Sequence, residues 1–187
     1  AEFRLNSAFP KATEVSGALS FNEKFLSVDD VKAQFLGGPA YLNGDIGRPG
    51  HALTITGQLS GEGIYDYYPL KGLQQLKGLT HYHLDFNFLE DNAFDAILKS
   101  NLQGLSISYP GLYSKPAKES TPLQVQWKRT KQGVARYHDQ IVADYDEGAT
   151  QLNLDFDTDE RHGLSFKRGA IAFDEAPIAP ESGLFFH

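Results

Sequence analysis

Two histidines stand where their spacing could support metal chemistry. His81 and His83 are two residues apart in a run of alternating polar and apolar residues. On a strand both would point to the same side, where they could share a metal ion with a nearby carboxylate. Asp85 and Asn87 continue the same polar row, so a solvated outer face explains the histidines equally well. We expect that solvated face and no metal site.

Three aspartates resemble the start of a calcium-binding loop. Asp155, Asp157 and Asp159 have the alternate spacing with which such a loop begins. The twelfth position of the loop requires a bidentate glutamate, and Phe166 stands there. The sequence therefore predicts no calcium site.

Basic residues are concentrated in one part of the chain, at Lys115, Lys118, Lys128, Arg129 and Lys131. We expect these residues to lie in solvated loops, and the alternative is that they contact a lipid headgroup. The whole chain has 17 Lys and Arg against 24 Asp and Glu, for a formal net charge of −7. This acidic balance disfavours nucleic acid as a partner, because phosphate binding requires a basic surface.

Catalytic motifs are missing from the sequence. It contains no G-x-S-x-G nucleophile elbow, no phosphate-binding glycine loop and no H-E-x-x-H segment. A hydrolase built on two carboxylates needs no short motif, but nothing in the sequence points to one. We therefore expect a protein without enzymatic activity and without a cofactor.

Alternation with a period of two dominates the chain and predicts an all-β fold. Tyr82, Leu84, Phe86 and Phe88 form its clearest example. Roughly a dozen such runs are separated by turn signals, which is typical of short and mostly antiparallel strands. The apolar phase slips at 29–30, where we expect a bulge or tight turn.

One segment departs from this alternation. Leu70, Leu73 and Leu76 recur every three residues, and Gly78 follows them as a stop signal. The spacing predicts one short helix over 67–76.

The stretch Ser100–Pro116, SNLQGLSISYPGLYSKP, contains a strand with a marked end. Leu105, Ile107 and Tyr109 alternate with serines. Pro110-Gly111 should then end the strand, because proline cannot donate to a strand ladder.

The same stretch carries a family resemblance. Its sequence SNLQGLSISYP, followed by Lys-Pro-Ala at 115–117, resembles a signature of the YhdP branch of AsmA-like proteins. Phe-Leu-Gly-Gly-Pro at 35–39 and the segment from Arg168 to Leu184 resemble two further motifs of that branch, in the expected order. The departures are Asn101 in place of aspartate and Tyr-Pro-Gly at 109–111 in place of Leu-Pro-Ala.

This resemblance implies a long periplasmic bridge, anchored in the inner membrane, whose curved β-sheet encloses a hydrophobic groove. The YhdP branch is implied to carry phospholipid toward the outer membrane. We expect residues 1–187 to form a single internal segment of such a groove, with 1–16 as a poorly patterned lead-in. The absence of methionine, even at position 1, agrees with a piece of a longer chain. Its neighbours would be other segments of that chain, and membrane contact would occur through parts outside this piece.

The expected mechanism is passive binding of acyl chains along the apolar face of the sheet. Burial of each methylene contributes about 0.8 kcal/mol, so ten contribute about 8 kcal/mol without any specific contact. A closed β-sandwich that binds a glycan or an envelope protein would show the same alternation and is the alternative. For the groove lining we predict Tyr82, Leu84, Phe86, Phe88, Leu105, Ile107, Leu123, Val125, Leu152, Leu154 and Phe156.

Overall fold

The computed structural model describes residues 2, 10–21, 25–69, 71–109, 113–159, 163–174, 176–178 and 180–186. Within these residues thirteen strands form one continuous, open sheet, accompanied by a single α-helix and two short 3₁₀ turns. The all-β prediction with one short helix is confirmed. The elements are β1 (Thr13–Phe21), β2 (Leu26–Phe35), β3 (Gly38–Ile46), β4 (Ala52–Ser60), α1 (Gly61–Tyr67), η1 (Lys71–Gln75), β5 (Leu76–Phe88), η2 (Glu90–Asn92), β6 (Phe94–Ser100), β7 (Leu105–Tyr109), β8 (Tyr113–Lys115), β9 (Leu123–Gly133), β10 (Arg136–Tyr145), β11 (Thr150–Asp159), β12 (Gly163–Phe173) and β13 (Gly183–Phe186).

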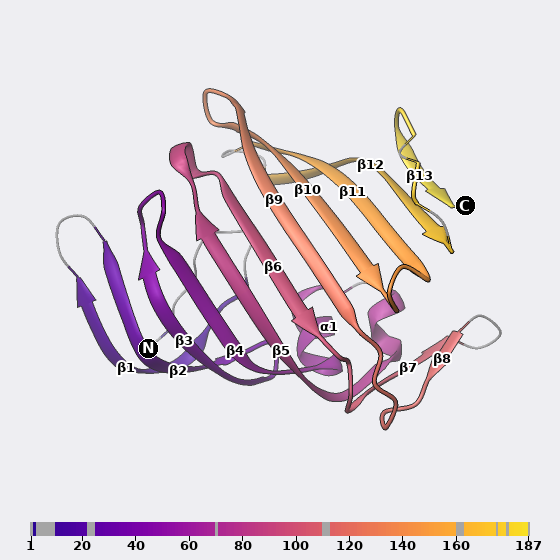
Figure 1. The fold of residues 1–187 in the computed structure, drawn as a ribbon, viewed down its shortest axis with the longest axis horizontal. Helices are drawn as coiled ribbons and strands as arrows, with labels where there is room; N and C mark the ends of the chain where they lie inside the picture. The colour runs from indigo at the N-terminus through magenta and orange to yellow at the C-terminus, as the bar shows by residue number, and fades with distance from the viewer. Residues whose placement is uncertain are drawn as a thin grey trace.

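The strands follow one another in chain order across the sheet, from β1 at one edge to β13 at the other (Figure 1). Hairpins join most neighbours, so all the described pairs are antiparallel except β12 with β13. The β7–β8 hairpin lies off the main path and continues from the start of β5. This single sheet differs from a closed sandwich, in which two sheets face one another.

The phase slip at 29–30 is a β-bulge inside a continuous strand. The register of β2 against β3 shifts between Val28 and Val31. Asp30 takes a positive φ of 45° there. The extra residue restores the apolar phase, so Val28 and Val31 are both buried.

The helix lies earlier than the leucine spacing predicted. α1 covers Gly61–Tyr67, and its N-cap Ser60 accepts a hydrogen bond from the backbone N–H of Gly63 at 2.9 Å. The leucine segment forms the 3₁₀ turn η1 instead, in which residues three apart share one side. Leu76 already belongs to β5, and Leu70 lies outside the described residues. The N-cap serine is the signal that would have placed the helix correctly.

The Phe-Leu-Gly-Gly-Pro motif forms the β2–β3 turn and packs against the start of α1. Gly37 has a φ of +78°, and a Cβ there would lie 2.1 Å from the Ser60 hydroxyl. The backbone N–H of Ser60 donates to the carbonyl of Leu36 at 2.9 Å. Turn and helix therefore approach so closely that only glycine fits at position 37.

The Ser100–Pro116 stretch folds into a corner at the same end of the sheet. The Ser100 hydroxyl donates to the carbonyl of His81 at 2.7 Å and accepts from the N–H of Leu102 at 3.0 Å. The Asn101 side-chain oxygen accepts from the N–H of Gln103 at 3.1 Å, a role that an aspartate oxygen would fill equally. The strand predicted after this corner is confirmed as β7, whereas Pro110-Gly111 lie outside the described residues.

Candidate functional site

Strand register determines which of the predicted lining residues share a face. Residues directly opposite one another in a sheet point to the same side. One such row runs through Leu84, Leu98, Val125, Ala143 and Leu152, from β5 to β11. Nine of the eleven predicted residues lie on the side that this row defines, and the other two are on β7.

We call this side the apolar face. The next row along the strands contains Phe86, Ala96, Trp127, Ile141 and Leu154. Both rows are formed by aliphatic and aromatic side chains over five adjacent strands. The members of the apolar face on these strands are Tyr82, Leu84, Phe86, Phe88, Phe94, Ala96, Leu98, Leu123, Val125, Trp127, Ile141, Ala143, Leu152, Leu154 and Phe156.

The part of the apolar face on β2–β6 is closed. The Phe35 ring on β2 lies 6.3 Å from the Tyr82 ring on β5, although two strands separate them in the sheet. The row between them consists of Ala33, Ala40 and Gly57, whose small side chains leave room for a tight curl. Tyr82, Leu84 and Phe86 are consequently buried in the core.

Burial also affects the hydroxyl group of Tyr82 in this closed part. The Tyr82 hydroxyl has no hydrogen-bond partner among the described residues. Its surroundings raise the pKa of the phenol, because the charged form would lose its hydration. Tyr82 therefore stays neutral and serves as a large apolar side chain here.

The part of the apolar face on β9–β13 is open. Leu123, Val125, Leu152, Leu154 and Phe156 are half-buried. Beyond them the same face carries exposed side chains, with Phe166 at 47% and Phe186 at 61% exposure. Phe166 packs against Phe156 with 5.6 Å between ring centroids. We call this region the open part; its residues are Leu123, Val125, Ile141, Leu152, Leu154, Phe156, Leu164, Phe166, Phe173, Leu184 and Phe186.

A buried ion pair interrupts the apolar face near the β9–β10 turn. Arg129 donates to both oxygens of Asp139, from Nε at 2.8 Å and from Nη2 at 3.0 Å. Trp127 Nε1 donates to the same carboxylate at 2.7 Å, and the Thr158 hydroxyl donates to it as well. Asp139 is 0% exposed, so four charge-assisted hydrogen bonds replace its hydration.

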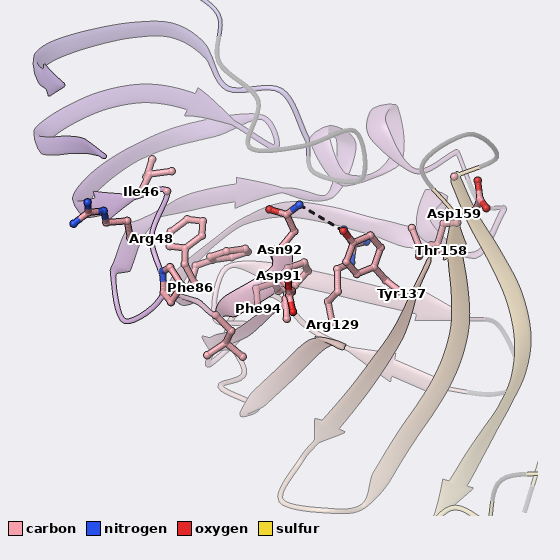
Figure 2. Close-up of a pocket in the computed structure, with 17 residues that line it drawn as sticks. Ile46, Arg48, Phe86, Asp91, Asn92, Phe94, Arg129, Tyr137, Thr158 and Asp159 are labelled. Atoms are coloured by element: carbon pink, nitrogen blue, oxygen red, sulfur yellow. Dashed lines mark hydrogen bonds between the residues drawn. The ribbon is translucent and has the colours of Figure 1, made fainter. Parts of the chain in front are cut away.

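A cavity of about 780 Å³ opens beside this ion pair (Figure 2). It is lined by the β3–β4 and β5–β6 connections, by residues 158–159 of β11 and by residues 163–164 of β12. Phe86, Phe88, Phe94 and Leu164 contribute apolar lining, while Arg48, Arg129, Asp91, Asn92 and Asp159 contribute polar lining. The cavity thus has an apolar wall and charges of both signs.

The two remaining predicted residues, Leu105 and Ile107, pair with the start of β5 rather than with the main rows. Leu105 is buried and Ile107 is half-buried.

Lys115 on β8, which the sequence analysis placed in the basic cluster, is only 1% exposed. Its Nζ donates to the carbonyls of Leu102 at 2.8 Å, Leu105 at 3.0 Å and Pro116 at 3.3 Å.

Lys115 is therefore a structural residue and not part of a solvated loop. Its ammonium group closes the corner formed by Ser100–Pro116. Burial lowers the pKa of this amine, and the charge of Glu119 opposes that shift. The basic cluster is not one patch: Lys118 and Lys128 are exposed, whereas Lys131 pairs with Asp91 at 2.7 Å.

Replacing Lys115 by methionine should lower the free energy of unfolding by about 2–3 kcal/mol, because hydrogen bonds from a charged donor to three carbonyls are lost. Urea denaturation measures this change. Lys118→Met, at an exposed site in the following loop, is the control and should stay within about 0.5 kcal/mol of the parent. Equal effects at the two positions would contradict a structural role for Lys115.

His81 and His83 lie on the outer face, opposite the apolar rows. His81 Nε2 is 2.9 Å from the Gln58 amide nitrogen, and His83 Nε2 is 3.0 Å from the Asp85 carboxylate. Among the described residues no group of three or more His, Cys, Asp or Glu could hold a metal ion. Asp155, Asp157 and Asp159 lie on strand β11, not in a loop.

Comparison with known protein families matches residues 1–185 to the family described as YhdP protein. The match covers nearly the whole chain. The chain belongs to the YhdP family. No curated protein and no solved structure matches the chain.

Membership of the YhdP family identifies this chain as an AsmA-like, lipid-transport-related protein of the cell envelope. No helix in the described part of the chain is both long and apolar enough to cross a membrane. That lipid contacts the eleven predicted lining residues remains a prediction for this YhdP protein. Four of them, Tyr82, Leu84, Phe86 and Phe88, lie in the closed part on β5.

Sequence reasoning did not select several residues of the open part. Ile141, Phe166 and Phe173 are members, and apolar residues also recur at alternate positions in their own strands. The alternation was therefore available as a signal. It did not show that these strands continue the row that contains Leu154, because register across strands is not a local property.

Proposed function

We propose that the open part of the apolar face binds phospholipid acyl chains, as one segment of a longer groove that carries phospholipid across the periplasm between inner and outer membrane. One observation carries this proposal: the rows that form a closed core on β2–β6 continue over β9–β13 without a covering layer among the described residues. Large exposed apolar patches are typical of binding surfaces.

The chemistry of the open part suits an acyl chain. Its side chains are aliphatic and aromatic, so they offer contact area without fixed polar partners. Each buried methylene contributes about 0.8 kcal/mol whatever its position, which permits a chain to slide along the surface. Binding of this kind requires neither a cofactor nor a catalytic group.

The edges of the sheet support continuation into neighbouring segments. Among the described residues β1 pairs only with β2, and β13 pairs only with β12. An edge strand presents unpaired N–H and C=O groups that can extend a sheet. Neighbouring segments of the parent chain are the partners that we propose for these edges.

Native mass spectrometry of the purified chain, with extraction and identification of bound molecules, tests the proposal. We expect phospholipid at near-stoichiometric amounts. The variant Phe166→Asp should lose most of it, because a carboxylate in the open part would have to lose its hydration against acyl chains. Phe166 is exposed, so this substitution should leave the fold intact.

Ser165→Asp is the matched control. Ser165 is the exposed neighbour of Phe166 on β12 and points to the outer face. It should keep the lipid content of the parent. Lipid-free parent protein that also fails to take up a fluorescent fatty acid would overturn the proposal, as would equal loss in the two variants.

A further inference from the structure

The cavity beside the Arg129–Asp139 ion pair runs across the strands rather than along them (Figure 2). Its lining includes one residue on the apolar face from each of six neighbouring strands; in sheet order they are Phe88, Phe94, Arg129, Tyr137, Thr158 and Leu164. Adjacent strands are about 4.8 Å apart, so five spacings give a length of roughly 24 Å along the sheet. The cavity therefore connects the closed part at β5 with the open part at β12.

The charged groups around this cavity already have partners or point elsewhere. Arg129 is held in the buried ion pair, and Asp91 pairs with Lys131 at 2.7 Å. Asp159 also has an interaction partner. The side chain of Arg48 extends away from Arg129 at the far end of the cavity in Figure 2. A charged ligand group would therefore lose its hydration here without gaining a free counter-ion among the described lining residues.

Uncharged polar groups of the lining are bonded within the protein too. The Thr158 hydroxyl donates to the carboxylate of the ion pair, and the Asn92 amide donates to the Tyr137 hydroxyl at 3.5 Å (Figure 2). Among the described residues, no buried side-chain polar atom that lacks a hydrogen-bond partner belongs to a residue of the lining. Hydrocarbon can therefore fill the cavity without leaving a buried donor or acceptor unsatisfied.

The size of the cavity suits a single hydrocarbon chain. Its volume of about 780 Å³ lies within the range of about 300–1,000 Å³ that is typical of sites for one small molecule. An acyl chain spans half of the hydrocarbon core of a bilayer, about 15 Å, so one chain fits within the length of roughly 24 Å. Ile46, Phe86 and Leu89 add apolar contact area to the wall formed by Phe88 and Phe94.

One residue belongs both to the cavity and to the open part. Leu164 lines the cavity, and Phe166, two residues further along β12, lies on the same face in the open part. Leu164 is 44% exposed. A ligand with two hydrocarbon chains could place one chain in each region and keep the polar group that joins them in water beside Leu164.

We infer that the cavity holds one of the two acyl chains of a phospholipid, while the second chain lies on the open part. The chain in the cavity crosses the strands from β12 to β5, with its glycerol end beside Leu164 and its methyl end against Phe88 and Phe94. This inference rests on the proposed function; it adds a site for one chain outside the open part and the direction in which that chain lies.

Photo-cross-linking tests the position of the acyl chain directly. Phosphatidylethanolamine that carries a diazirine at the methyl end of each acyl chain is supplied in vesicles to the purified protein. The vesicles are removed, and adducts are mapped by mass spectrometry after illumination. We expect adducts on residues 86–94 as well as on the open part. With the diazirine beside the glycerol instead, we expect the adducts at 163–166.

Leu89→Asp tests the cavity without changing the open part. Leu89 lines the cavity, is 45% exposed and directly follows the last residue of β5. A carboxylate there would have to lose its hydration against the acyl chain, so adducts on 86–94 should fall at least fivefold. Leu79→Asp is the matched control: Leu79 is 46% exposed on the outer face of β5, and this variant should give the same adducts as the parent.

Each outcome bears on a different claim. Adducts confined to the open part, or equal adducts on 86–94 in the parent and in Leu89→Asp, overturn the site in the cavity and leave the proposed function standing. Adducts on neither region overturn the proposed function itself. A fatty acid with the same terminal diazirine is the third probe; if it labels the cavity while phospholipid does not, the cavity takes a free fatty acid and the phospholipid assignment is wrong.

Discussion

Replacing Asp139 by alanine is expected to lower the free energy of unfolding by about 3–5 kcal/mol, because Arg129 would be left as a buried charge without its counter-ion. The substitution also removes the acceptor of Trp127 Nε1 and of the Thr158 hydroxyl. Chemical denaturation followed by tryptophan fluorescence measures the change, since Trp127 is the only tryptophan in the chain.

Two comparisons give this prediction a sharp test. Asp157→Ala removes an exposed carboxylate whose ion pair with Lys167 spans 3.4 Å, and it should cost less than about 1 kcal/mol. The double variant R129Q/D139N keeps an amide oxygen at position 139 for Trp127 and should be more stable than Asp139→Ala. A double variant less stable than the single one would contradict the buried-charge explanation.

Replacing Phe86 by alanine is expected to lower the free energy of unfolding by about 3–5 kcal/mol as well, because the substitution leaves a cavity in a packed core. Phe86 is 2% exposed and stacks on Phe94 with 4.7 Å between ring centroids. Thermal and urea denaturation measure the loss. The same property makes Phe86 unsuitable for a test of lipid binding, since its substitution would report on folding.

Phe166→Ala is the matched comparison in the open part, on the same face of the sheet. It should cost less than about 1 kcal/mol, because nearly half of this side chain is already in contact with water. Bound lipid should raise the stability of the parent more than that of Phe166→Ala. Similar losses at positions 86 and 166 would mean that the apolar face is closed throughout.

Local sequence patterns predicted those elements whose formation depends on residues close together in the chain. Period-two alternation placed the strands around Tyr82–Phe88 and after Ser100, and the phase slip at 29–30 indicated the bulge in β2. The helix was displaced because a leucine period of three fits a 3₁₀ turn as well as an α-helix. Ser60, whose side chain caps α1, lies before the leucine segment, and the leucine period gives no sign of it.

The roles of individual charged residues could not be predicted in this way. Lys115 is enclosed by three backbone carbonyls that come from both ends of the Ser100–Pro116 corner. Arg129 and Asp139 meet because the β9–β10 hairpin places them opposite one another. In each case strand register or loop conformation determines the partner of the charged side chain. Neither can be read from the identity of a lysine or arginine in the sequence.

The sequence by itself determined the family, the strands and which side of each strand is apolar, because these depend on short motifs and on the two-residue period of the extended chain. Only the tertiary structure decided that one part of the apolar face is closed and the other open. The physical reason is that a closed face needs side chains from strands several places apart to meet, and local alternation does not specify such contacts. The Phe35 ring on β2 packs 6.3 Å from the Tyr82 ring on β5 across the small residues Ala33, Ala40 and Gly57, whereas Leu164, Phe166 and Phe173 on β12 remain exposed.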